Sequence, residues 1–351
     1  MSRFLNKEEK SKHITSLKSS LGNQVSILGH HYQEQGVIDH CDYTGDSLEL
    51  AQRIAHLDSE HIVFCGVYFM AESAALLAKE EQSVYLPEPA ANCVMSLMSP
   101  AYLIERLFKK LTASGRKLIP VAYVNTEVDV KAIVGKYGGA TCTSSSADKV
   151  LKWALNEGDG VFFLPDKNLA YNTAKNIGIP KKNLHILDIR KKGDVADLEA
   201  SKQADIIVWP GLCAIHARFL MQHIHLAREN YPNCTIVVHP ECTPEVVKAS
   251  DAVGSTSFII NYAKNAPDGS HLVIGTEINL VNRLKNEHKH RIKTTPLRAS
   301  ACSHMAKCNP DKLYTTLHTI ANNNAIPISI EQETKMFARA ALERMMQIIA
   351  V

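Results

Sequence analysis

Cys213 and His216 lie in a stretch that joins a buried-strand pattern to two residues able to bind a metal. The stretch reads IIVWPGLCAIHARF, residues 206–219, and its β-branched run ends in Trp-Pro-Gly just before Cys213. No second cysteine stands two or three residues away, so the chain has no Cys-x-x-Cys metal site here. If Cys213 binds a metal, its partners must come from other parts of the chain.

Two further cysteines occupy comparable places, because Cys93 and Cys302 also follow sets of strand-like segments. Three thiolates can hold Zn²⁺, with a histidine or water as the fourth ligand, or a [4Fe–4S] cluster. A cluster held by three cysteines leaves one iron open to act as a Lewis acid. The spacing of the residues leaves both kinds of metal site open.

The other cysteines of the nine have a simpler interpretation as small hydrophobic core residues. We expect this of the four that adjoin strands or helices, which are Cys41, Cys65, Cys142 and Cys234. Cys242 and Cys308 are near the candidate site in the sequence but have no counterparts elsewhere in the chain.

Polar side chains suited to proton transfer and anion binding follow several strand-like runs. His, Tyr and Glu can move protons, whereas hydroxyls and backbone N–H groups at strand-to-helix turns suit a carboxylate or phosphate. The first group is His30, Tyr32, Tyr123, Asn125, His239 and Glu241, and the hydroxyl group is Ser47, Ser144, Ser255 and Thr256. Together they predict an anionic substrate.

Each of these features also has a structural alternative. The segments GDS at 45–47 and TSSS at 143–146 can be helix N-caps, and Tyr123 and Asn125 can share a polar surface. The segment HPEC at 239–242 favours a function, because a structural strand end rarely needs His, Pro and Glu together. We expect five other histidines to be surface or packing residues: His31, His40, His61, His223 and His225.

The elements that must position these residues repeat along the chain. Strand-like runs alternate with helix-like stretches in three series, which begin near residues 25, 117 and 234. Such alternation predicts βαβ units with parallel sheets, and similarity in a fixed order predicts a repeated architecture. We therefore predict an α/β fold of three similar αβα (Rossmann-like) domains in a pseudo-threefold arrangement, with their strand C-termini facing one centre. Their limits are 1–96 plus 297–351, with the N- and C-terminal helices, then 97–210 and 211–296.

The bulk composition excludes several classes of protein. The 351 residues exceed one ordinary domain of about 100–200 residues. The net charge of +3 is too weak to indicate nucleic-acid binding. The polar N-terminus predicts no signal peptide, and no apolar run approaches the roughly 20 residues that cross a bilayer. We expect a cytoplasmic protein with reduced cysteines and no nucleic-acid or membrane partner.

A dozen motifs, in order from about Ile27 to Met305, resemble the quinolinate synthases, the A-type enzymes of bacterial NAD biosynthesis. The motifs are GHHYQ, GDSLELA, GVYFMAES, NCVM, VAYVNT, CTSSSA, FLPDKNL, WPGLCAIHARF, HPEC, VGSTS, GTE and CSHM. The resemblance implies a transferase that condenses iminosuccinate (iminoaspartate) with dihydroxyacetone phosphate to give quinolinate, phosphate and water. It implies three αβα domains around a central, oxygen-sensitive [4Fe–4S] cluster, one per chain. It also implies a functional link to an aspartate oxidase or dehydrogenase that makes iminosuccinate.

The same resemblance implies roles for individual residues. Cys93, Cys213 and Cys302 would bind the cluster. The implied iminosuccinate contacts are His30, Ser47, Tyr123, Val124, Asn125, Ser144, His239, Pro240, Glu241 and Thr256. His216 and Ser255 resemble the phosphate-side residues, and Tyr32 resembles the tyrosine that gates the site. The expected proton-transfer residues are Tyr32, His30, Tyr123, His239 and Glu241. Some members carry two more cysteines before the third ligand, but Pro296 and Ala299 stand there in this chain, so it has no redox disulfide at that place.

Three other functions fit the sequence less well. The density of acid–base residues argues against an iron–sulfur sensor or a ligand-binding module without turnover. The lack of His-Glu-x-x-His and of close ligand pairs argues against a zinc hydrolase. The lack of G-x-G-x-x-G and of G-x-x-x-x-G-K-[ST] argues against a nucleotide-binding dehydrogenase.

Overall fold

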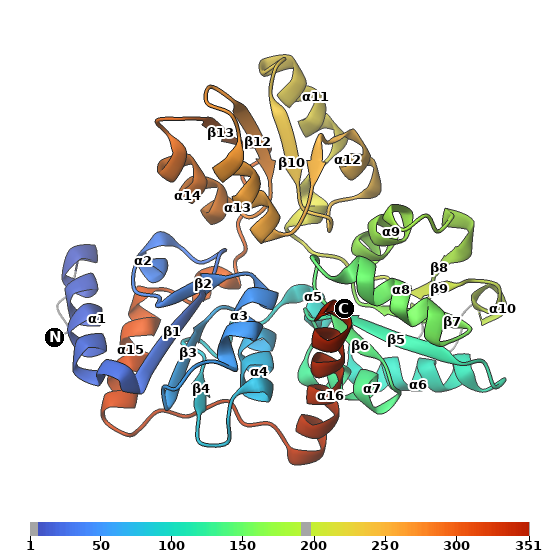
Figure 1. The fold of residues 1–351 in the computed structure, drawn as a ribbon, viewed down its shortest axis with the longest axis horizontal. Coiled ribbons are helices and arrows are strands. Elements are labelled where there is room, and N and C mark those ends of the chain that lie inside the picture. Colours follow the sequence, from blue (N-terminus) through green and yellow to red (C-terminus); the bar gives the residue numbers. More distant parts are fainter. Residues whose placement is uncertain (1–5, 191–197, 351) are drawn as a thin grey trace.

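The structure is a computed structural model that describes residues 6–190 and 198–350. It is an α/β protein with three separate sheets, each of them wholly parallel and flanked by helices (Figure 1). The outer limits of the first predicted domain, residues 1 and 351, lie outside the described residues. Among the described residues, none of the helices is both long enough and apolar enough to pass through a membrane.

The first sheet has the strand order β2-β1-β3-β4. Its strands are β1 (Val25–His30), β2 (Tyr43–Gly45), β3 (His61–Cys65) and β4 (Ser83–Tyr85). The helices along this part of the chain are α1 (Lys7–Leu21), α2 (Gln35–Ile38), α3 (Ser47–Ile54), α4 (Tyr68–Leu77) and α5 (Val94–Leu97). Helix α15 (Pro310–Ala321) returns from the far end of the sequence and packs against α1 (Figure 1).

The second sheet has the order β6-β5-β7-β9-β8. Its strands are β5 (Leu118–Tyr123), β6 (Ala140–Cys142), β7 (Gly160–Leu164), β8 (Leu184–Ile186) and β9 (Ile206–Val208). Its helices are α6 (Ala101–Thr112), α7 (Val128–Lys136), α8 (Ala147–Glu157), α9 (Lys167–Asn176) and α10 (Leu198–Lys202). Every residue of β5 and β7 is buried, as expected of parallel strands covered by helices on both faces.

The third sheet has the order β11-β10-β12-β13. Its strands are β10 (Thr235–Val238), β11 (Ala252–Val253), β12 (His271–Gly275) and β13 (Lys293–Pro296). Its helices are α11 (Met221–Asn230), α12 (Pro244–Ala249), α13 (Thr256–Asn265) and α14 (Ile278–His288). Short 3₁₀ helices are η1 (Gly22–Gln24), η2 (Lys181–Asn183), η4 (His216–Arg218) and η5 (Met305–Lys307).

All three sheets share one arrangement, in which the first strand lies between the second and the third and a further strand follows the third. In such open parallel sheets a crevice forms at the carboxyl ends of the strands, where the strand order reverses. The sequence patterns do not predict β2, β8 and β13. These are short edge strands, and β2 and β13 lack the apolar run that marks a buried strand.

The last helix, α16 (Gln332–Ala350), packs against α7, α8 and β6 of the second sheet (Figure 1). The predicted limits group it with the first unit instead. Its approach to α7 is close, because a Cβ on Gly135 would lie 1.9 Å from the backbone oxygen of Phe337. Ala338, Leu342 and Met345 of α16 join the same hydrophobic core as β5 and β6. The last helix therefore completes the core of the second sheet.

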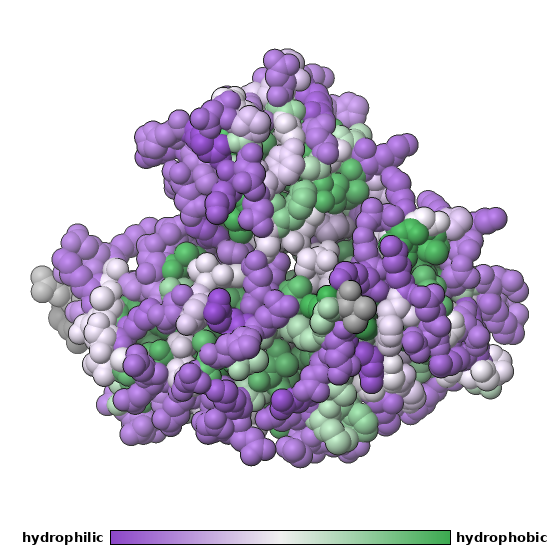
Figure 2. All heavy atoms as spheres, in the orientation of Figure 1, coloured by the Kyte–Doolittle hydropathy of each residue, from purple (hydrophilic) through white to green (hydrophobic). Residues whose placement is uncertain are grey.

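The molecular face in Figure 2 is largely hydrophilic at its rim. Hydrophobic residues are visible between the polar ones on the upper, left and right parts of this face. The chemistry-bearing residues described next come from the strand ends of all three sheets.

Candidate active site

Loops from the carboxyl ends of all three sheets line one cavity of about 160 Å³. The first strands β1, β5 and β10 lead into it with His30, Tyr123 and His239. The turns after the second strands add Ser47, Ser144 and Thr256. The shared topology explains this convergence, because equivalent strand ends from three sheets carry equivalent loops.

Most of the residues named from the sequence lie on this cavity. They are His30, Tyr32, Ser47, Cys93, Tyr123, Asn125, Ser144, Cys213, His216, His239, Glu241, Thr256 and Cys302. Val124, Pro240 and Ser255 do not line it. Val124 is buried in the core, the Pro240 carbonyl accepts from Asn172, and Ser255 caps α13. The substrate contacts of all these residues stay predictions.

Cys93, Cys213 and Cys302 each follow the strand of their sheet that comes last in the sequence. These strands are β4, β9 and β13 respectively. All three are free and half-buried, and all three line the cavity. Burial raises the pKa of the Cys93 thiol to about 12, and it also raises the pKa values of Cys213 and Cys302. A bound metal would therefore have to displace their protons, as thiolate ligation requires.

The other cysteines lie off the cavity. Cys65, Cys142, Cys234, Cys242 and Cys308 are buried, and Cys41 is half-buried. The five histidines expected to be surface or packing residues do not line the cavity either.

Two buried carboxylates hold two of the cysteine loops. Asp166 Oδ2 accepts from the backbone N–H of Cys213 at 2.9 Å, and Glu277 Oε1 accepts from that of Cys302 at 3.3 Å. Both are the N-cap residues of the helices after the third strands, α9 and α14. Val67 stands at the same place before α4 in the first sheet, so that loop lacks the carboxylate.

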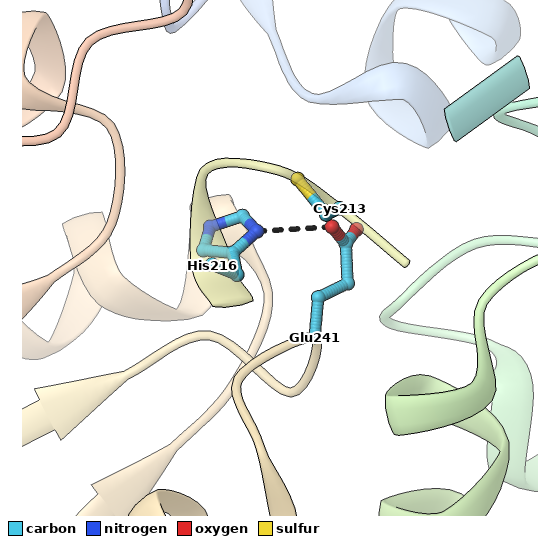
Figure 3. A group of neighbouring side chains, drawn as sticks. All are labelled: Cys213, His216 and Glu241. Carbon is cyan, nitrogen blue, oxygen red and sulfur yellow. Dashed lines mark hydrogen bonds and ion pairs between the residues drawn. The ribbon is translucent and has the colours of Figure 1, made fainter. Parts of the chain in front are cut away.

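Glu241 is the centre of the polar network. The Tyr123 hydroxyl donates to its Oε1 at 2.5 Å, and His216 Nδ1 lies 2.9 Å from its Oε2 (Figure 3). Burial alone would raise the pKa of Glu241, but His216, His239 and the two hydrogen bonds lower it to about 2. The side chain is therefore a buried carboxylate whose two oxygens both accept hydrogen bonds.

Two histidines of the cavity, His30 and His239, are buried in surroundings that disfavour the charged ring. Burial lowers the pKa values of His30 and His239 to about 3. The ring of His239 stacks on that of His216, with centroids 4.3 Å apart and planes 11° apart. Neutral imidazoles can accept or donate one proton each, which suits acid–base work.

Cys213, His216 and Glu241 form a compact group whose possible ligand atoms lie within 4.8 Å of one another (Figure 3). Such a Cys-His-Glu set can hold a single ion such as Zn²⁺. The three cysteines offer a second possibility, because an iron–sulfur cluster is larger than one ion and is held by thiolates. Their convergence on one cavity from three sheets fits a cluster, and they form no disulfides.

Hydroxyl groups at helix N-termini face the same cavity. Asp46 caps α3 with a reciprocal bond to Glu49, and Asp46 and Ser47 both line the cavity, so GDS is a helix cap that also borders the site. Thr256 is the first residue of α13. Asn125 Oδ1 is buried and has no hydrogen-bond partner in the described ranges. These groups can bind carboxylates and polar substrate atoms.

The structure adds cavity residues that sequence reasoning missed. They include Phe69, Met70, Asn92, Arg218 and His304. Arg218 is the single Lys or Arg among the described residues that line the cavity, and its side chain is exposed. It lies in the stretch 206–219 with Cys213 and His216, so the sequence does contain a signal for it, a positive charge next to two candidate site residues.

The spacing of three residues between Cys213 and His216 predicts a helix that begins near Cys213 and carries both residues on one face. The structure has a turn from Cys213, with Ala217 N donating to its carbonyl at 3.0 Å, and then the short 3₁₀ helix η4. The proximity expected for Cys213 and His216 is nevertheless present, because their candidate ligand atoms belong to one compact group.

Comparison with known protein families connects this geometry to a reaction. Residues 12–347 match the family described as "Quinolinate synthetase A protein". The chain belongs to the quinolinate synthetase A family. This confirms the resemblance stated from the motifs and makes the chain a member of an enzyme family.

Relatives of this quinolinate synthetase A family member are similar over nearly its full length. The quinolinate synthases of Streptomyces coelicolor and Corynebacterium glutamicum are each 41% identical to it, covering 94% and 97% of this chain and 86% and 88% of their own. That of Haloarcula marismortui is 38% identical and covers 99% of this chain and 93% of its own.

Proposed function

We propose that the chain is a quinolinate synthase, which condenses iminosuccinate with dihydroxyacetone phosphate to quinolinate, phosphate and water in de novo NAD biosynthesis. The observation that carries the proposal is one cavity that joins three cysteines to the Tyr123–Glu241–His216 network. The family relationship supports the same reaction. The proposed location is the cytoplasm, with iminosuccinate supplied by an aspartate oxidase or dehydrogenase.

The proposed cofactor is one [4Fe–4S] cluster held by Cys93, Cys213 and Cys302. The donor set supports it, because three free thiols from three sheets line the same cavity. When bound, the cluster would supply an open iron that acts as a Lewis acid. The proposed three domains, 1–96 plus 297–351, 97–210 and 211–296, would surround it.

Iminosuccinate carries two carboxylates, and the cavity offers neutral donors for them. Ser47 and Thr256 begin α3 and α13, where helix N-termini favour negative charge. Ser144 adds a hydroxyl, and Asn125 presents an amide with an unpaired oxygen. These residues are proposed to hold the substrate against the proton-transfer groups.

The proton transfers of condensation and dehydration need one charged group and several neutral groups at fixed positions around the substrate. Glu241 is proposed as the charged centre, because its carboxylate accepts from both Tyr123 and His216. The neutral rings of His30 and His239 are proposed to exchange protons with the substrate. Tyr32 lines the cavity and is proposed to gate it and to move protons.

The test is to purify the protein without oxygen and to assay it for quinolinate. We expect about four irons and four sulfides per chain. Quinolinate should form when dihydroxyacetone phosphate is added with aspartate, an aspartate oxidase and an electron acceptor other than oxygen, which together supply iminosuccinate. Air should bleach the protein and abolish turnover. One zinc per chain without sulfide would favour the Cys213–His216–Glu241 group instead and contradict the cluster.

A further inference from the structure

Two asparagines of α9 hold the turn that carries Glu241. Asn168 Nδ2 donates to the Glu241 carbonyl at 3.2 Å. Asn172 Nδ2 donates to the carbonyls of Pro240 and Cys242, at 2.7 and 2.9 Å. The two asparagines are four positions apart, so their side chains leave the same face of the helix. Three consecutive carbonyls of a loop from the third sheet thus accept from one helix of the second sheet.

The turn that carries Glu241 has few hydrogen bonds of its own. It follows β10 and closes with one backbone bond, from the Cys242 N–H to the His239 carbonyl at 3.0 Å. Residues 240–242 belong to neither a helix nor a strand, so no regular structure supplies donors to their carbonyls. A buried carbonyl needs a donor, and the asparagines provide it.

The side-chain amide of Asn172 is used as a donor only. Its Nδ2 serves two carbonyls, whereas its Oδ1 is buried and has no hydrogen-bond partner among residues 6–190 and 198–350. A buried acceptor without a partner costs free energy, and an apolar side chain would fill the same space without that cost. Packing alone therefore does not explain an amide at this position, whereas the two carbonyls of the turn do.

Helix α9 also connects this turn to the loop of Cys213. Its N-cap residue, Asp166, accepts from the Cys213 backbone N–H. The helix packs against α12, which follows the turn (Figure 1). The Glu241 side chain in turn meets Tyr123 and His216, which follow strands β5 and β9 of the second sheet. The second sheet thus fixes both the main chain and the side chain of Glu241.

We propose that Asn168 and Asn172 are positioning residues that hold the Glu241 carboxylate in place for Tyr123 and His216. The inference rests on the proposed function, because Glu241 is the charged centre of the proposed proton transfers. Neither asparagine lines the cavity, so both act through Glu241. Positioning of this kind matters, since a displacement of about 1 Å in a reacting group can lower a rate about 100-fold.

The experiment uses the anaerobically purified holoenzyme. Asn172→Ala removes two hydrogen bonds to the turn, and Asn168→Ala removes one. Asn176→Ala is the matched amide control, because Asn176 is an exposed asparagine of α9 that donates to Asp148 instead. Leu151→Ala is the stability control, because Leu151 is a buried residue of α8 in the core of the second sheet and lies off the cavity. Iron content, thermal midpoint, kcat and both KM values are measured for each.

We expect Asn172→Ala to keep its iron and its KM for dihydroxyacetone phosphate while kcat falls about 10- to 100-fold. Asn168→Ala loses one bond instead of two, so its kcat should fall less, about 3- to 10-fold. Asn176→Ala should match the wild type. Leu151→Ala should lower the thermal midpoint but keep kcat within about twofold of the wild type, because it leaves the turn in place.

A double variant tests whether Asn172 acts through Glu241. Tyr123→Phe removes the hydroxyl that donates to Glu241 Oε1, and its kcat should fall about 100-fold. If Asn172 places Glu241 for that bond, adding Asn172→Ala to Tyr123→Phe should lower kcat by no more than about threefold further. Independent effects would multiply instead.

The proposal is contradicted if Asn172→Ala and Asn168→Ala both keep kcat within about twofold of the wild type, or if the losses multiply in the double variant. A fall in kcat as large in Leu151→Ala would make the asparagines structural only. If Asn172→Ala does not fold, Asn168→Ala decides alone by the same limits, singly and combined with Tyr123→Phe. These outcomes leave the proposed function intact, since the wild type still makes quinolinate. A wild type with a full cluster but no quinolinate would overturn the proposed function as well as the positioning role.

Discussion

Asp166 and Cys213 are joined by a hydrogen bond from the cysteine's backbone N–H to the buried carboxylate, 2.9 Å long. Glu277 and Cys302 repeat the relationship in the third sheet, at 3.3 Å. In both cases the carboxylate also caps the helix that follows the third strand. The loop geometry of two cysteines is thus tied to the start of a helix, and we expect the metal site to depend on it.

Asp166→Asn should therefore loosen the Cys213 loop. The amide can still accept from Leu169, but it then turns its NH₂ group toward the Cys213 N–H and loses that bond. A lost buried hydrogen bond costs about 1–3 kcal/mol, so the cluster should be lost severalfold faster. The measurement is the decay of visible absorbance after an iron chelator is added. Asp251→Asn is the control, because Asp251 accepts from the backbone of Ile236 away from the cavity. Equal decay in both variants would contradict the role of Asp166.

Glu241→Gln should abolish most turnover while the cluster remains. The substitution keeps the size of the side chain but removes the charge that His216 and Tyr123 donate to. We expect kcat to fall about 100-fold or more, as for loss of a proton-transfer group. Anaerobic kinetics and the cluster spectrum measure the two effects separately. Glu245→Gln, an exposed residue four positions on, should behave as wild type. Unchanged kcat in Glu241→Gln would make the HPEC segment structural only.

Cys213→Ser should lose the cluster or hold it only weakly. A hydroxyl is a poor ligand for iron compared with a thiolate, and the proposed site has three thiolates. Iron and sulfide analysis of freshly purified protein gives the answer. Cys41→Ser is the matched control, since Cys41 is also half-buried but lies off the cavity. A full and stable cluster in Cys213→Ser would remove the basis of the three-cysteine site.

Arg218→Ala should weaken the binding of dihydroxyacetone phosphate. Arg218 is the single Lys or Arg that lines the cavity in the described ranges, and a guanidinium binds phosphate well. We expect the KM for this substrate to rise about tenfold or more, the loss of a charge-assisted bond of about 1.5–3 kcal/mol, while the KM for iminosuccinate changes little. Arg218→Lys should retain part of the affinity because it keeps the charge.

The same kinetics separate Arg218 from His216, which the resemblance placed on the phosphate side. Both His216 ring nitrogens already have protein partners, so His216→Ala should lower kcat more than it raises that KM. If His216→Ala raised the KM and Arg218→Ala did not, the phosphate would lie beside His216 instead.

Most of the candidate site could be predicted from the types of residue that follow the expected strands. Cys93, Cys213 and Cys302 could be singled out because each follows a set of strand-like segments, and all three line the cavity. The contacts of Thr276 could not be predicted, because a buried threonine has no local signal and its hydroxyl meets Tyr32 and His216 only in the folded chain. Partners so distant in the sequence become visible only when the fold brings them together.

In the fold, too, elements with their own sequence pattern could be predicted, whereas elements that depend on distant partners could not. Runs such as those of β5 and β7 are apolar throughout and were recognised as strands. The edge strand β13, Lys-Thr-Thr-Pro, has no such pattern and exists because β12 offers it a partner. The position of α16 could not be predicted from the sequence either. Its contact with α7 depends on the close approach of the two helices at Gly135 of α7, where a side chain would not fit.

That contact has a consequence for how the protein is made. The ribosome synthesises β5, β6 and α7 long before it reaches residues 332–350, so the apolar surfaces that α16 covers stay exposed while the intervening residues are made. The second sheet cannot finish its core as it emerges, although its own strands and helices are already present. Its final closure waits until α16 has been synthesised, and until then the nascent chain exposes an apolar surface that chaperones can bind.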